Sequence, residues 1–176
     1  MTYSQSAIRK ECAWLVALCC PIVYASAIPA MAAGRYHVTD LGVLSGGLVS
    51  FSRATDINSN GQVVGHSGTS TAFAHPFLWT SEAGMQDLGT LPGGDNVSYA
   101  EGINSGGQVV GWSYAATNSG LTTHAFLWTS GGGIQDLGDL PGGQDYSSAN
   151  AINAAGQVVG VSSRTGPHLR PFVWTS

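Results

Sequence analysis

The amino-acid sequence predicts an all-β fold made of three tandem repeats, each with four short antiparallel strands. The first observation is that four short segments recur three times in the same order. The second is the composition, because 25 of the 176 residues are glycine, 9% are charged and 43% are hydrophobic. Such a chain can bury a core and form many tight turns, which excludes a disordered protein. The third is that no segment after residue 33 shows a helical period.

Residues 1–33 differ in kind and are predicted to be a secretory signal peptide. Arg9 and Lys10 form a short basic region, and an apolar run follows from Ala13 to Tyr24. This run is shorter than the roughly 20 residues of a membrane span, although an uncleaved anchor is the alternative. Small residues come next, and cleavage is expected near Ala32–Ala33. The predicted location of the mature protein is therefore extracellular.

The mature chain, residues 34–176, is predicted to be a single repeat domain without cysteine. Cys12, Cys19 and Cys20 all lie in the leader, which excludes disulfide and thiol chemistry from the domain. Four of the six basic and nine of the ten acidic residues remain, a net charge near −5. Nucleic-acid binding needs a basic surface, so no nucleic-acid partner is predicted. No membrane contact is predicted after cleavage.

The repeat divides this domain at approximately 34–80, 81–129 and 130–176. The recurring segments are Ser-x-Ala-x-x-Ile-Asn at 52–58, 98–104 and 147–153; Gly-Gln-Val-Val-Gly at 61–65, 107–111 and 156–160; Phe-x-Trp-Thr-Ser at 77–81, 126–130 and 172–176; and Asp-Leu-Gly at 40–42, 87–89 and 136–138. Four segments in one order, three times over, indicate one repeated structural unit.

In the middle repeat, the predicted strands are Ser98–Asn104, Gln108–Ser113, His124–Thr129 and Ile134–Gly138. The alternation of the third strand places Phe126 and Trp128 on one face. Ala125 and Leu127 lie on the other. A strand that is apolar on both faces must be covered on both. Each repeat is therefore expected to pack between neighbouring repeats.

The turns between the first and second strands support this interpretation. They run from Asn58 to Gly61, from Asn104 to Gly107 and from Asn153 to Gly156. Asparagine suits the first position of a type I turn, and glycine suits the left-handed residue that closes such a hairpin.

Four short strands in each unit favour a propeller-like arrangement, with a β-prism or β-solenoid as the alternative. Tyr36–Gly42 matches a fourth strand, whereas the last repeat stops after a third strand at Pro171–Ser176. The N-terminal segment is therefore expected to complete the last blade. Because propellers have four or more blades, a homodimer forming a six-bladed ring is one expectation. A fragment of a longer repeat protein is the other.

The third predicted strand of the middle repeat begins His124-Ala125-Phe126 and continues Leu127-Trp128-Thr129. At these residues the sequence resembles the HAF-repeat family, which is named for a His-Ala-Phe triplet. The other copies depart from it, as His75-Pro76-Phe77 and Arg170-Pro171-Phe172. The stretch 87–94 also resembles the family pattern, while 136–143 is close and 40–47 is weaker. The resemblance covers 36–176 and implies an extracellular bacterial protein, but no activity, catalytic residue or cofactor.

A residue present in every copy is expected to serve the scaffold, because a catalytic site needs its groups only once. Asp40, Asp87 and Asp136 are predicted to accept hydrogen bonds from amides of the Gly-Gly turn that follows each of them. Trp79, Trp128 and Trp174 are predicted to pack between repeats.

Calcium is the alternative role for the acidic residues. Oxygen ligands near the Gly-Gly turns are offered by Asp95, Asn96, Gln144 and Asp145. The spacing matches no calcium loop, so no cofactor is predicted. A metal role for His75 and His124 would need a third copy, where Arg170 stands instead, so no metal site is predicted.

The loops after the second and fourth strands vary between copies, whereas those after the first and third are short and alike. Alternate loops of an up-and-down sheet lie at one end, and binding residues concentrate in such loops. The predicted binding residues are Trp112, Tyr114, Tyr99, Tyr146, Asp95, Asp145, His66 and Arg164. Aromatic residues beside carboxylates suit a glycan or an extracellular protein. The predicted function is therefore a secreted, non-catalytic binding module.

Two other functions remain open. One is a structural component of the cell surface that assembles through its repeats. The other is a hydrolase acting on polysaccharide, which would use a pair of carboxylates. Asp95 and Asp145 are the candidate pair, because they are expected in similar places in adjacent repeats. No catalytic residue is predicted, and the protein is not expected to be an enzyme.

Overall fold

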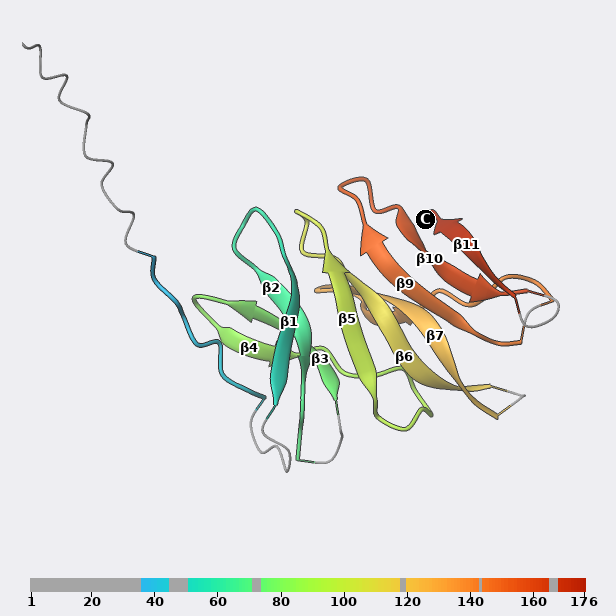
Figure 1. Cartoon of the computed structure of the whole chain (residues 1–176), viewed down its shortest axis with the longest axis horizontal. Coiled ribbons are helices and arrows are strands. Elements are labelled where there is room, and N and C mark those ends of the chain that lie inside the picture. Colours follow the sequence, from blue (N-terminus) through green and yellow to red (C-terminus); the bar gives the residue numbers. More distant parts are fainter. Residues whose placement is uncertain (1–35, 45–50, 71–73, 118–119, 143, 165–167) are drawn as a thin grey trace, which may run out of the picture. The chain divides into compact units, whose positions relative to one another are not determined.

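The computed structural model describes residues 36–44, 51–70, 74–117, 120–142, 144–164 and 168–176 (Figure 1). The predicted signal peptide lies outside these residues. The chain divides into two units, Met1–Val38 and Thr39–Ser176, and the strands all belong to the second. In the part that the structure describes, no helix is long and apolar enough to cross a membrane.

The structure contains three antiparallel sheets, one for each repeat, which confirms the all-β prediction. The first sheet consists of β1 (Ser52–Ile57), β2 (Val63–Ser67), β3 (His75–Thr80) and β4 (Gly84–Asp87). The second consists of β5 (Ser98–Ile103), β6 (Val109–Thr117), β7 (Gly120–Thr129) and β8 (Gly133–Asp136). The third has three strands, β9 (Ser147–Ile152), β10 (Val158–Ser163) and β11 (Leu169–Trp174).

The turn between the first two strands of each sheet has the predicted form. In the middle repeat, the side-chain oxygen of Asn104 accepts hydrogen bonds from the amides of Gly106 and Gln108, both at 3.0 Å. Gly107 has a φ of 77°, a left-handed conformation that favours glycine. The corresponding Gly61 and Gly156 have φ values of 72° and 79°.

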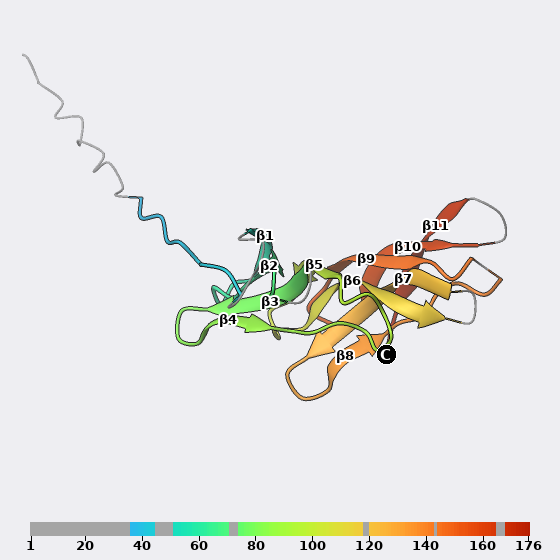
Figure 2. The same cartoon turned by 90° about the horizontal axis from the view of Figure 1, so that it is seen from below.

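Each sheet packs against the next through its first strand. β5 contacts β2 and β3 of the first sheet, and β9 contacts β6 and β7 of the second (Figure 2). Phe126 and Trp128 are buried in one cluster with Val64 of the first sheet. Ala125 and Leu127 lie in another cluster, with residues of the third sheet. The prediction that both faces of this strand are covered is therefore confirmed.

Hydrogen bonds between repeats fix the offset of neighbouring sheets. The side-chain amide of Asn58 donates to the main-chain oxygen of Asn104 at 2.9 Å. Asn104 donates in the same way to Asn153 at 3.0 Å. Because both the turn and its partner are repeated, successive sheets meet through equivalent atoms.

A crossing segment follows the fourth strand and leads to the next sheet. In the first such segment between sheets, the carboxylate of Asp87 accepts a hydrogen bond from the amide of Gly89 at 2.8 Å. Leu91 then donates its amide to Ser113 Oγ at 3.0 Å. The aspartates accept a main-chain hydrogen bond, but the predicted donor was wrong: it is the glycine two residues on, not the Gly-Gly turn. The reason is that an Asx turn spans only two residues.

The chain's own N-terminal segment does not complete the third sheet. Residues 36–44 form no strand, and Leu41 and Leu44 pack against the first sheet beside Val63 and Phe77. The third sheet has the order β11-β10-β9, and the described sheets form no closed ring. The segment therefore behaves as a crossing segment that enters the first sheet.

Candidate functional site

Four of the predicted binding residues form a continuous row of aromatic rings. The ring centroids of His66 and Tyr99 lie 4.4 Å apart. Tyr99 stacks on Trp112, with a centroid distance of 4.4 Å and an interplanar angle of 23°. Trp112 meets the edge of Tyr114 at 5.9 Å. We call these four residues the aromatic row. Phe51 extends it beyond His66 at 6.1 Å.

The strand register explains how the row is built. Tyr99 on β5 and Trp112 on β6 are direct cross-strand partners. Tyr114 lies two residues beyond Trp112 on the same strand and therefore points to the same face. His66 on β2 occupies the position in the first sheet that Trp112 occupies in the second. The packing of β5 on β2 then brings the two sheets' rings together.

The second sheet also corrects one boundary. The predicted strands end at Ser113 and begin again at His124, but β6 continues to Thr117 and β7 begins at Gly120. Tyr114 is therefore held in a strand and not in a loop. The long hairpin pairs Tyr114 with Thr123 and Ala115 with Thr122. This gives the aromatic row a rigid support.

All four residues of the aromatic row are half-buried. Burial lowers the pKa of His66 below its ordinary value of 6.5, and the positive charge of Arg53 lowers it further. The imidazole is therefore neutral at pH 7. Its Nδ1 atom is buried and has no hydrogen-bond partner in the described part of the chain. The row thus presents uncharged rings with polar edges.

The other four predicted residues lie outside the row. No ring contact joins Tyr146 to it among the described residues, and Asp95 and Arg164 are exposed. The carboxylate of Asp145 accepts a hydrogen bond from Thr117 at 3.2 Å. Asp95 and Asp145, which were predicted to occupy similar places, are offset by one residue in the repeat. Asp145 matches Asn96 instead, because each lies two residues before the first strand and has a positive φ, of 48° and 53°.

The structure also contains two His–Asp pairs that sequence reasoning missed. His75 Nδ1 lies 2.8 Å from the carboxylate of Asp87, and His124 Nδ1 lies 2.7 Å from that of Asp136. Each pair links the third and fourth strands of its sheet. The signal was the constant separation of 12 residues in two copies. Among the described residues, no three His, Cys, Asp or Glu side chains gather as metal ligands.

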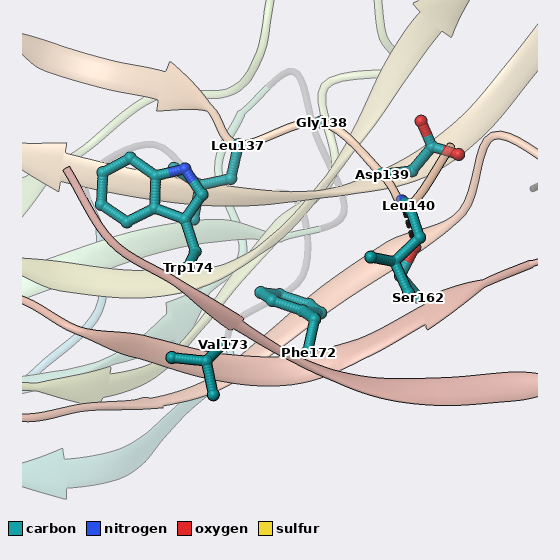
Figure 3. A pocket seen from close by; sticks show the side chains of 8 residues that line it. All are labelled: Leu137, Gly138, Asp139, Leu140, Ser162, Phe172, Val173 and Trp174. Carbon is teal, nitrogen blue, oxygen red and sulfur yellow. Dashed lines mark hydrogen bonds between the residues drawn. The ribbon is translucent and has the colours of Figure 1, made fainter. Parts of the chain in front are cut away.

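Two hollows lie on the third sheet. One is a cavity of about 110 Å³ between β11 and the crossing segment Leu137–Leu140. Figure 3 shows Phe172 and Trp174 pointing from β11 toward this segment, whereas Val173 points the other way. The second is an open groove of about 460 Å³ on the outer face of β10 and β11, lined by residues that include Val159 and Val173.

Comparison of the chain with protein-family models, with curated proteins and with solved structures finds no match. The resemblance to the HAF-repeat family therefore stays a prediction based on the motifs themselves.

Proposed function

We propose that the protein is a secreted, non-catalytic binding module whose aromatic row contacts an extracellular glycan. The observation that carries this proposal is the row itself, which joins four rings from two repeats on one rigid surface. Part of the ring surface remains accessible, since none of the four residues is fully buried.

The chemistry of the row favours sugars over charged polymers. Aromatic faces bury the C–H faces of sugar rings, while the tyrosine hydroxyls and the indole N–H can pair with sugar hydroxyls. Nucleic-acid bases also stack on such rings, but their phosphates need nearby cations. The chain carries 6 basic and 10 acidic residues, and Arg53 is the cation that acts on His66. A neutral glycan is therefore the ligand class that fits best.

The arrangement of the sheets is part of the proposal. We infer that the sheets are the blades of a propeller-like assembly and that the leader exports the chain from a bacterial cell. The repeated offset between successive sheets supports the first inference. The basic and apolar segments of residues 1–33 support the second. N-terminal sequencing of the exported protein tests the export, and a start near Ala33 is the expected result.

A structural role at the cell surface is the second candidate. It is favoured by apolar residues that remain exposed at both ends of the row of sheets, Ile57 on the first and Val173 on the third. A hydrolytic role is not proposed. The carboxylate of Asp145 is engaged by Thr117, and Asp95 does not match it in the repeat.

The glycan proposal is tested by intrinsic fluorescence titration with a panel of neutral and acidic polysaccharides. Binding of a neutral polysaccharide should change the tryptophan emission of the wild-type protein. Trp112→Thr should lower the affinity at least tenfold when binding is measured by isothermal titration calorimetry, because this variant lacks the reporting indole. The matched control is Tyr146→Thr, which removes a half-buried aromatic side chain outside the row. Equal loss in both variants, or binding by none of the panel to folded protein, would contradict the proposal.

A further inference from the structure

The outer face of the third sheet is exposed, whereas the equivalent faces of the first and second sheets are each covered by the sheet that follows. Val64 and Val110 are equivalent residues of β2 and β6, and both are 0% exposed beneath the next sheet. Their counterpart on β10, Val159, is 43% exposed. Leu78 and Leu127 are likewise buried, whereas their counterpart Val173 is 67% exposed.

The first sheet shows the complementary gap. In the second and third sheets, the first strand is buried against the preceding sheet. Ala100 on β5 and Ala149 on β9 therefore have no exposed surface. The counterpart of these alanines, Ala54, is exposed on β1. Ile103 is buried, but its counterpart Ile57 is 62% exposed. The exposed side of β1 is therefore equivalent to the sides of β5 and β9 that cover the preceding sheet, and it matches the exposed face of the third sheet.

The cavity beside β11 lies where the first two sheets have their fourth strand. In the first sheet, the fourth-strand residue Met85 packs against Leu41, Trp79 and their neighbours. In the second sheet, Ile134 packs in the same way against the buried cluster. The equivalent residues of the third sheet, Leu137 and Trp174, line the cavity instead (Figure 3). β11 is also an edge strand, and no other described strand pairs with its outer side.

The N-terminal segment carries the residue that fits this cavity. Asp40 corresponds to Asp87, because each precedes the same Leu-Gly pair and caps the glycine amide. Val38, two residues earlier, therefore corresponds to Met85. Val38 is 90% exposed in the isolated chain. A fourth strand formed by residues 36–40 would place an apolar side chain opposite Trp174, as Met85 lies opposite Trp79.

The charges at this junction are complementary. In the first two sheets a histidine on the third strand pairs with the aspartate that ends the fourth strand, as His75 does with Asp87. The third sheet has Arg170 at the histidine position, and the N-terminal segment has Asp40 at the aspartate position. Neither Arg170 nor Asp40 forms an ion pair with another described residue. An added fourth strand would bring the two together.

We propose that a second copy of this chain docks head to tail on the third sheet. Residues 36–40 of the incoming copy add to β11 as an antiparallel fourth strand, with Val38 in the cavity and Asp40 beside Arg170. The β1 strand of the same copy then covers Val159 and Val173. Main-chain hydrogen bonds supply affinity in this form of strand addition, and the side-chain pockets supply specificity.

The residues that follow the incoming strand, Gly42 and Leu44, already have the conformation of a crossing segment. Leu44 donates its amide to Ser67 Oγ at 3.0 Å, just as Leu91 donates to Ser113 and Leu140 donates to Ser162. Gly42 has a φ of 79°, close to the 78° of Gly89. Docking would therefore require a new backbone conformation only in the residues before Asp40, which limits the conformational part of the cost of association.

The test is a charge exchange measured by analytical ultracentrifugation on the full chain, expressed with its leader so that processing occurs in the cell. The wild-type chain should sediment as an assembly of two or more copies. Asp40→Arg and Arg170→Asp should each weaken self-association at least tenfold. An equimolar mixture of the two variants should restore assembly, because each junction then joins opposite charges. The double variant should also assemble.

The outcomes separate the proposal from its alternative. If the double variant regains a compact state at the mass of one chain while the mixture does not assemble, the segment completes its own third sheet. A wild-type chain that stays monomeric at every concentration also overturns the proposal. Asp40→Asn, which keeps the capping oxygen, separates loss of charge from loss of the turn.

A second variant tests the cavity. Val38→Asp should abolish assembly and expose the β11 amides to hydrogen exchange. Leu121→Asp, which places the same charge on an exposed residue of the β6–β7 hairpin, should leave assembly unchanged. Equal behaviour of both variants would contradict the proposal. Glycan binding by the aromatic row is read separately, because none of its residues lies at this junction.

Discussion

A β-carbon added to Gly111 would lie 1.9 Å from the main-chain oxygen of Tyr99. The two strands approach this closely because β5 carries a bulge between Ala100 and Gly102. The same relationship recurs at Gly65, at 1.9 Å, and at Gly160, at 2.1 Å. The last glycine of the Gly-Gln-Val-Val-Gly segment is therefore required by the bulge in the neighbouring strand.

Replacement of this glycine should be severe. Gly111→Ala should lower the free energy of unfolding by about 3 kcal/mol or more, because the clash is with backbone and the buried strand cannot move freely. The measurement is urea unfolding followed by circular dichroism. Gly131→Ala is the control, since a β-carbon there meets no atom within 4 Å. Similar losses in the two variants would contradict the close approach seen at β5.

Substitution of the turn asparagines should separate the contribution of the turn from that of the hydrogen bond between repeats. Asn104→Ala should lower the free energy of unfolding by about 3 kcal/mol, because two turn amides lose their acceptor and the third repeat loses a donor. Asn153→Ala removes an equivalent turn but no described bond to a following repeat. Its cost should be about 1 kcal/mol. Equal costs would show that the bond between repeats contributes nothing.

Asp87 should make the fold sensitive to acid. Burial raises the pKa of Asp87, but hydrogen bonds from His75 and from the Gly89 amide outweigh burial and hold the pKa below 3.8. The unfolded chain therefore binds the proton at higher pH than the folded chain. The stabilisation is complete above about pH 4 and is lost as pH falls through the folded pKa. Asp87→Asn should flatten the stability profile in this window, whereas Glu82→Gln, an exposed control, should not.

Protonation of His66 should destabilise the folded protein. Burial and Arg53 hold its pKa below 6.5, so the folded state disfavours the imidazolium. Stability from the neutral ring is present above pH 6.5 and falls as the pH drops through the lower folded pKa. His66→Phe should remove this part of the pH dependence and leave Trp112 fluorescence unchanged between pH 5 and 7. A variant with the wild-type profile would exclude His66 as the source.

The repeat made much of the fold predictable. Period-two alternation correctly assigned Phe126 and Trp128 to one face and Ala125 and Leu127 to the other, because strand geometry alone fixes that pattern. The turn glycines were predictable for a similar reason. Only a left-handed residue closes such a hairpin.

The aromatic row was predicted only as a set of residues near one end of the sheets. The contact between His66 and Tyr99 depends on how β5 packs on β2. The sequence of neither strand indicates how the two strands are offset. The length of the β6–β7 hairpin was missed because Ser-Gly and threonine residues suggest a loop. The pairing of Thr117 with Gly120 shows that the ladder extends as far as these two residues. The His–Asp pairs depend on register across β3 and β4, which becomes visible only once the strands are paired.

The bond from Asn58 to Asn104, repeated from Asn104 to Asn153, has a consequence for how such genes can change. Each repeat meets its neighbours through the same atoms, so an internal duplication would insert a unit that already matches both sides. Stability in such arrays is close to a sum over units and their junctions. Recombination between the copies can therefore lengthen or shorten the protein while the contacts between neighbouring repeats stay the same.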